Sequence, residues 1–194
     1  MRRLPDESDD SKVGRRELSQ EEDPRSKNSR SSIARRNQYL TLPTDLDRAK
    51  NYGDIFSIVK KAVKRSLGRH RVGLMLYLGN LPIRVGAFHP LGTNDIVLNR
   101  RLLGQTRSLK EKSNVFAILV HEYLHSLGYT DERQVRRMTH KICQENFGKA
   151  HQVVQASLTG PWAELTGEDF EEIQQELNLE MVRDFERIEG GYII

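Results

Sequence analysis

The 194-residue chain has a single cysteine, Cys143, and no long run of apolar residues. One cysteine excludes an internal disulfide, and no stretch approaches the roughly eighteen consecutive apolar residues of a membrane-spanning helix. The arginines near the N-terminus are not followed by the apolar stretch that a secretory signal peptide needs. We therefore expect a soluble protein of the reducing cytoplasm that has no membrane as a partner.

A strong excess of one charge is also lacking, since 31 basic residues face 27 acidic ones and the net charge is +4. An excess this small does not favour nucleic acid as the main partner.

The charges are dense near the N-terminus, where residues 1–37 contain only four aliphatic side chains larger than alanine: Leu4, Val13, Leu18 and Ile33. We predict that residues 1–40 are a disordered charged tail and that 41–194 form one domain. A docking arm for an acidic partner is the alternative for the tail.

The domain alternates between helical and strand patterns. Apolar residues recur at helical spacing over 55–67, after Thr44 or Asp45 as a candidate N-cap, and Ser108 and Glu111 have the spacing of a capping box. Further helices are predicted after Thr130 or Asp131 and over 167–188, and strands over 72–82, 83–88 and 95–99. Between these two helices, residues 151–158 follow a turn at Gly148, and Gly160–Pro161 breaks the chain after them. We predict an α+β fold in which a small mixed sheet packs on a central helix, residues 108–127, followed by C-terminal helices.

The central helix carries the sequence HEYLH, which places His121 and His125 one helical turn apart. At 100° per residue the two imidazoles lie about 40° apart around the axis, so both can reach one metal ion. Glu122 follows the first histidine and can reach a water on that ion without being a ligand. Burying two histidines and a glutamate that have no binding partner would cost folding free energy. We therefore predict a metal site, with Zn²⁺ as the metal.

The motif extends to HEYLHSLGYTD, which fits H-E-x-x-H-x-x-G-x-x-D. It resembles the zincin metallopeptidases, and specifically the metzincins, where a glycine turns the chain so that a residue ten positions after the first histidine reaches the metal. The resemblance implies His121, His125 and Asp131 as zinc ligands, Asp131 standing where the snapalysin-type proteases also have aspartate. By spacing alone, Glu145, Glu132 and His151 remain alternatives for the third ligand.

The resemblance implies a zinc-dependent peptidase that acts on peptides or proteins, with Glu122 as general base for a metal-activated water. The strand at 95–99, just before the helix, is the expected edge on which an extended substrate adds as a further strand. Tyr129 is a candidate donor to a developing oxyanion.

Two other functions remain open. The stretch also resembles the H-G-x-L-H-x-x-G-Y-D-H signature of metal-dependent endoribonucleases that process ribosomal RNA, with which it shares Leu124, Gly128 and Tyr129, but those enzymes have glycine in place of Glu122. A non-catalytic zinc-binding regulatory module is the third hypothesis, although a purely structural site has no need of the glutamate.

Overall fold

The computed structural model describes residues 41–101, 107–160, 177–183 and 185–186. The predicted tail, 1–40, lies outside the described residues, and so does much of the predicted helix at 167–188. The described helices are α2 (Thr41–Arg48), α3 (Tyr52–Leu67), α4 (Leu109–Ser126), α5 (Glu132–Phe147) and α6 (Gln152–Thr159). The described strands are β1 (Met75–Gly79), β2 (Ala87–Phe88), β3 (Asp95–Asn99) and β4 (Glu180–Met181). The predicted α+β class is confirmed.

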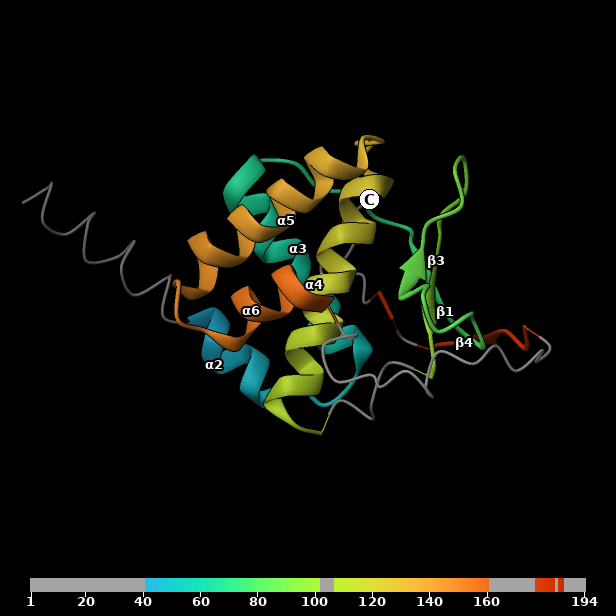
Figure 1. Cartoon of the computed structure of the whole chain (residues 1–194), viewed down its shortest axis with the longest axis horizontal. Coiled ribbons are helices and arrows are strands. Elements are labelled where there is room, and N and C mark those ends of the chain that lie inside the picture. The colour runs from blue at the N-terminus through green and yellow to red at the C-terminus, as the bar shows by residue number, and fades with distance from the viewer. Residues whose placement is uncertain (1–40, 102–106, 161–176, 184, 187–194) are drawn as a thin grey trace, which may run out of the picture. The chain divides into compact units, whose positions relative to one another are not determined.

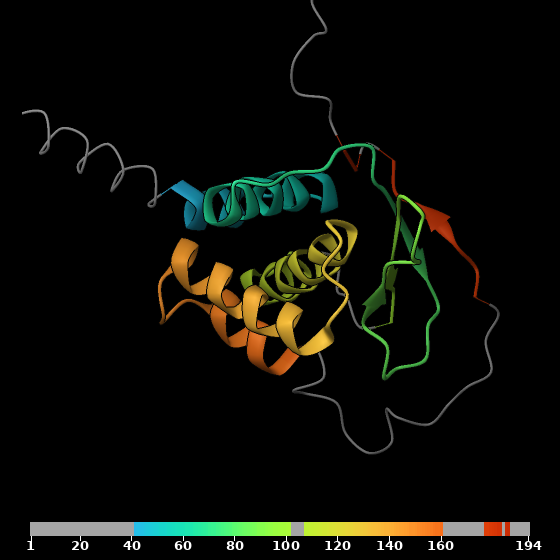
Figure 2. The same cartoon turned by 90° about the horizontal axis from the view of Figure 1, so that it is seen from above.

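Helix α4 is the centre of this fold, because it contacts α2, α3, α5, α6 and strand β2 (Figures 1 and 2). It begins at the predicted capping box: the Ser108 hydroxyl accepts from the Glu111 N–H at 3.1 Å, and the Glu111 carboxylate accepts from the Ser108 N–H at 3.0 Å. Apolar residues from Val115 to Leu124 are buried against the surrounding helices and the sheet. None of the described helices combines the length and apolar composition needed to cross a membrane.

The first part of the domain has one more helix than predicted. Thr44 and Asp45 do not cap the long helix but lie within α2, and Asn51 is the N-cap of α3, its side chain accepting from the Asp54 N–H at 2.8 Å. Leu42 and Leu46 of α2 are buried. The apolar spacing over 55–67 located α3 correctly. The start of the helix was misplaced because several residues before it, Asn51 among them, can act as an N-cap.

The sheet has the strand order β2-β3-β1-β4, with β1 parallel to β3 and both outer pairs antiparallel. The strand at 95–99 is therefore not the edge, because β3 is paired on both sides, and the edge nearer α4 is β2. A connection over 80–86 carries the chain past the end of β3, where the buried Asn99 amide donates to the carbonyls of Leu81, Pro82 and Val85. This arrangement brings β2 beside the central helix.

The helix predicted over 167–188 is wrong in its described part. Glu180 and Met181 form β4, paired with Leu78 and Tyr77 of β1, and the Leu177 carbonyl accepts from the Asn80 N–H at 2.9 Å. The segment has the spacing of an amphipathic helix, but its backbone N–H and C=O groups form hydrogen bonds with a distant strand instead.

Candidate metal centre

His121 and His125 face each other on α4. Their Nε2 atoms are 3.2 Å apart and their ring centroids 4.9 Å apart. Both side chains are about four-fifths buried, at 20 % and 17 % exposed. The helical spacing therefore aims two imidazole nitrogens at the same point, as the sequence predicted.

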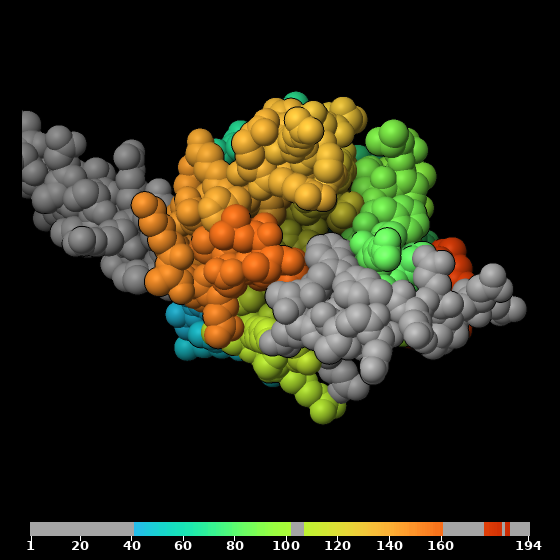
Figure 3. All heavy atoms as spheres, in the orientation of Figure 1, coloured from blue at the N-terminus to red at the C-terminus, as the bar shows by residue number. Residues whose placement is uncertain are grey.

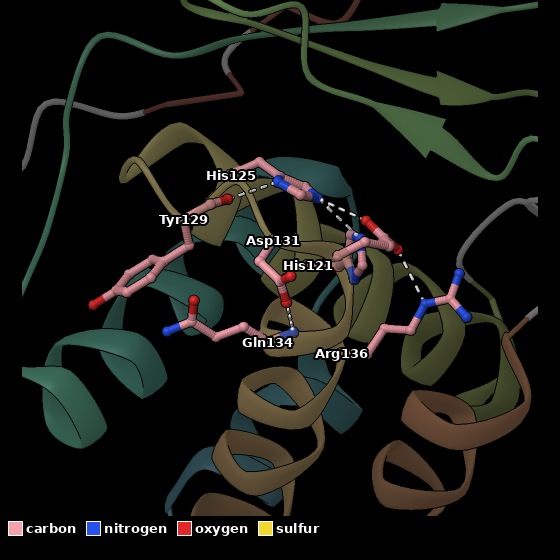
Figure 4. Close-up of polar contacts among 7 residues, drawn as sticks. His121, His125, Tyr129, Asp131, Gln134 and Arg136 are labelled. Atoms are coloured by element: carbon pink, nitrogen blue, oxygen red, sulfur yellow. Dashed lines mark hydrogen bonds and ion pairs between the residues drawn. The ribbon is translucent and has the colours of Figure 1, made fainter.

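The turn after α4 orients the second histidine. Gly128 has a φ of +95°, which an L side chain adopts only with strain, and it reverses the chain directly after the helix. The Tyr129 carbonyl then lies 2.8 Å from His125 Nδ1. Figure 4 draws this contact as a dashed line. With Nδ1 donating its proton to this carbonyl, the Nε2 lone pair of His125 is free for a metal ion.

Glu132, in the first turn of α5, completes a group of three donors. Its Oε1 lies 3.2 Å from His121 Nε2 and its Oε2 lies 3.3 Å from His125 Nε2. The two contacts use different oxygens of the carboxylate. Taken with one ligand atom from each residue, the three donors lie within 4.8 Å of one another and form a candidate metal group of the described chain.

The third donor beside the two histidines is thus the carboxylate of Glu132, one residue after the predicted Asp131. Asp131 is the N-cap of α5, and its carboxylate accepts from the Gln134 N–H at 2.5 Å (Figure 4). An aspartate before a helix is drawn to the first unpaired N–H groups. The physical reason for the difference is that the cap holds Asp131 while the following residue projects from the helix toward the histidines.

The remaining alternatives for the third ligand lie elsewhere in the described structure. Glu145 is on the exposed surface of α5, with its carboxylate 3.7 Å from the Lys141 ammonium. His151 is the N-cap of α6, and its Nδ1 accepts from the Val153 N–H at 3.2 Å. Neither belongs to the group of three donors.

Glu122 is buried beside this group, with 5 % of its surface exposed. Burial is the main reason that the pKa of its carboxyl is raised to about 8, and the negative charge of Glu132 adds to the rise, whereas the backbone N–H of His89 opposes it. A divalent cation nearby would favour the carboxylate and lower this pKa again. Glu122 is therefore placed to hold or release a proton close to the metal group.

Two residues of the metal group, His121 and Glu132, also have shifted pKa values. Burial lowers the pKa of His121, a shift that His125 reinforces and Glu132 opposes, so the imidazole tends to be neutral, which is the form that binds a metal. Burial by itself would raise the pKa of Glu132, but His121 and Arg136 outweigh it and hold the pKa below its usual value. Glu132 is therefore an anionic donor.

His121 and Glu132 of the metal group line a cleft of about 620 Å³. Its floor is one face of α4, including Ala117, Ile118 and His121, and its walls include residues of α5, the end of α6 and the segment 84–87. Figure 3 shows part of it, with α4 visible between α5 and the strands. A long substrate therefore has space next to the three donors.

Tyr129, the candidate donor to a developing oxyanion, contacts the site through its backbone carbonyl. Its hydroxyl accepts from Arg69 at 3.1 Å, and Figure 4 shows the ring pointing away from the two histidines. Sequence reasoning also missed the cleft residues Arg84, Arg136 and Thr139. The spacing of Arg136 four residues after Glu132 was a signal for one of them.

No protein-family model matches the chain, and no curated protein or solved structure gives a significant match.

Proposed function

We propose that this chain is a zinc-dependent peptidase. The observation that carries the proposal is the convergence of His121, His125 and Glu132 on one point beside the buried Glu122, at a cleft large enough for a peptide. Two imidazoles and one carboxylate are a donor set typical of catalytic zinc, which takes three protein ligands, whereas structural zinc is usually held by four.

Each residue has a distinct task in this proposal. His121, His125 and Glu132 hold the ion, and the Tyr129 carbonyl keeps His125 in the required tautomer. Zinc held there would supply a Lewis acid and would lower the pKa of a bound water. Glu122 would accept a proton at its carboxylate and pass it to the leaving amine of the substrate. The peptide lies along the segment 84–87 at the sheet edge, above α4.

The first test measures zinc content and hydrolysis of an unfolded protein substrate on the same samples. Wild type should hold about one zinc per chain and lose activity with a chelator. His125→Ala should lose zinc and activity, whereas Glu122→Gln should keep zinc and lose activity, because the amide cannot accept a proton. Glu145→Gln is the matched control, since Glu145 lies on the exposed surface of α5.

Full hydrolysis by the Glu122→Gln variant would contradict the mechanism. The same samples are assayed on structured RNA, the substrate of the alternative function. Chelator-sensitive cleavage of RNA, without any cleavage of protein, would reject the peptidase proposal in favour of a ribonuclease.

A further inference from the structure

One face of α5 lines the cleft. Glu132, Arg136 and Thr139 are spaced four and three residues apart, so their side chains project from the same side of the helix, and all three line the cleft. Arg84, from the connection between β1 and β2, lines it as well. The cleft therefore holds two arginines that come from distant parts of the sequence.

Arg136 is held next to the metal group. Its Nε donates to Glu132 Oε1 at 3.0 Å, and the same oxygen is 3.2 Å from His121 Nε2. Within the described chain its terminal nitrogens have no hydrogen-bond partner, and Figure 4 shows them turned outward from the histidine pair. An arginine used at Nε alone keeps two terminal NH₂ groups with which it can bind a carboxylate.

Arg84 is exposed, and among the described residues it has no hydrogen bond or ion pair. The charged residues of the described cleft walls are Arg84, Arg136, Glu122 and Glu132. Two arginines offset two glutamates, so a divalent metal would leave the cleft with a net positive charge. Such a cleft attracts anions and disfavours cationic substrates.

Thr139 adds an unused hydrogen-bonding group to the same wall. Thr139 is 3 % exposed, and its Oγ1 has no hydrogen-bond partner among the residues that the structure describes. Buried hydroxyls are nearly always paired, so an unpaired one beside a cleft indicates a group that a ligand can satisfy. Arg136 and Thr139 are less than one helical turn apart on α5.

We propose that the cleft selects peptides that present a carboxylate next to the scissile bond, and that Arg84 and Arg136 bind it. This inference rests on the proposed peptidase function. Arg136 Nε lies 3.0 Å from Glu132 Oε1, an oxygen of the candidate metal group, so its guanidinium is within about one to two residues of extended peptide from that group. The carboxylate belongs to an aspartate or glutamate side chain or to the C-terminus of the peptide.

The experiment compares zinc-loaded wild type and variants on matched peptides. A single glutamate is moved through each position of an Ala/Leu host peptide that is acetylated and amidated, and each peptide is paired with its glutamine version. Host peptides with a free C-terminus test the other source of the carboxylate. The readout is the ratio of kcat/KM for the acidic and neutral member of each pair.

We expect the acidic member to be preferred about tenfold or more at one position, since hydrogen bonds to a charged group have this strength. The ratio should fall toward one in Arg84→Ala and in Arg136→Ala. Arg137→Ala is the control, because Arg137 is exposed on α5 outside the cleft lining, and it should keep the wild-type ratio. Zinc content is measured for Arg136→Ala, which loses the contact with Glu132; Arg84 has no such contact.

A second measurement separates this inference from the proposed function. Binding of the same peptides to zinc-loaded Glu122→Gln is measured by calorimetry, which needs no turnover. Hydrolysis without an acidic preference would overturn the inference and leave the peptidase proposal standing. Preferential binding of acidic peptides without any hydrolysis by wild type would overturn the peptidase proposal and leave only the recognition of a carboxylate by Arg84 and Arg136. Absence of both binding and hydrolysis would overturn both.

Discussion

The carboxylates of Asp131 and Glu132 are adjacent in the chain and point to different partners. Asp131 accepts from the Gln134 N–H at the start of α5, whereas Glu132 lies 3.2 Å and 3.3 Å from the Nε2 atoms of the two histidines. The start of a helix separates the two side chains, since the N-cap residue has extended backbone and the next residue is already helical. One of these residues therefore stabilises the helix, and the other faces the candidate metal site.

This division of tasks leads to opposite effects of amide substitutions. Asp131→Asn should keep both zinc and stability, because asparagine caps helices as well as aspartate does, and Asp131→Ala should lower the free energy of unfolding by about 1 kcal/mol. Glu132→Gln should lose most of the bound zinc, because an amide is a poor ligand for this ion. Zinc content and urea unfolding are measured on all three. Loss of zinc in Asp131→Asn would restore Asp131 as the third ligand.

Removing the metal should destabilise the protein. Binding of an ion to the folded state alone stabilises it by about 2.7 kcal/mol when the free ion is at a hundred times its Kd. Thermal unfolding with zinc and with a chelator should therefore give different Tm values in wild type and the same Tm in His121→Ala. An equal shift in that variant would mean that the ion binds elsewhere.

Tyr123 connects the central helix to the chain that enters the sheet. Its buried hydroxyl donates to the Arg71 carbonyl at 3.1 Å and accepts from the Arg71 N–H at 2.6 Å. Tyr123→Phe leaves both backbone groups without this partner and should lower the free energy of unfolding by about 1–3 kcal/mol. Tyr129→Phe, which removes an exposed hydroxyl bonded to Arg69, is the control and should have a smaller effect on urea unfolding.

Replacement of Thr139 by valine should stabilise the protein. The substitution keeps the shape of the side chain and removes a buried hydroxyl that has no partner in the described part of the chain. Burial of such a hydroxyl costs about 1–3 kcal/mol. Urea unfolding of metal-free protein should show a higher midpoint with an unchanged m-value. A lower midpoint would show that the hydroxyl is hydrogen-bonded in the folded protein.

Cys143 should be unreactive while the protein is folded. Burial raises the pKa of its thiol to about 12 from the ordinary value of 9.0, and only the Ser157 hydrogen bond opposes the rise. Because the folded pKa is above the unfolded one, the stability from this group is complete below about pH 9 and is lost as the pH rises toward 12. Thiol labelling at pH 8 should follow the unfolding transition in guanidinium; rapid labelling of folded protein would contradict the burial.

Several features could be predicted from the sequence because neighbouring residues decide them. The capping box at Ser108 and Glu111 located the start of α4, and the spacing of His121 and His125 already placed both imidazoles on one side of that helix. The run at 95–99 became β3 with the predicted bounds. In each of these cases the geometry of a single helix or strand determines the outcome.

The tertiary structure alone decided how these elements meet. Local rules allow either Asp131 or Glu132 to face the histidines, and the packing of α5 against α4 selects Glu132. The edge position of β2 and the strand at Glu180–Met181 depend on pairing between distant segments, which periodicity does not report. The sequence thus determined the two histidines and the helix that carries them, whereas the third donor, the cleft and its arginines required the chain to be folded, because contacts between distant residues position them.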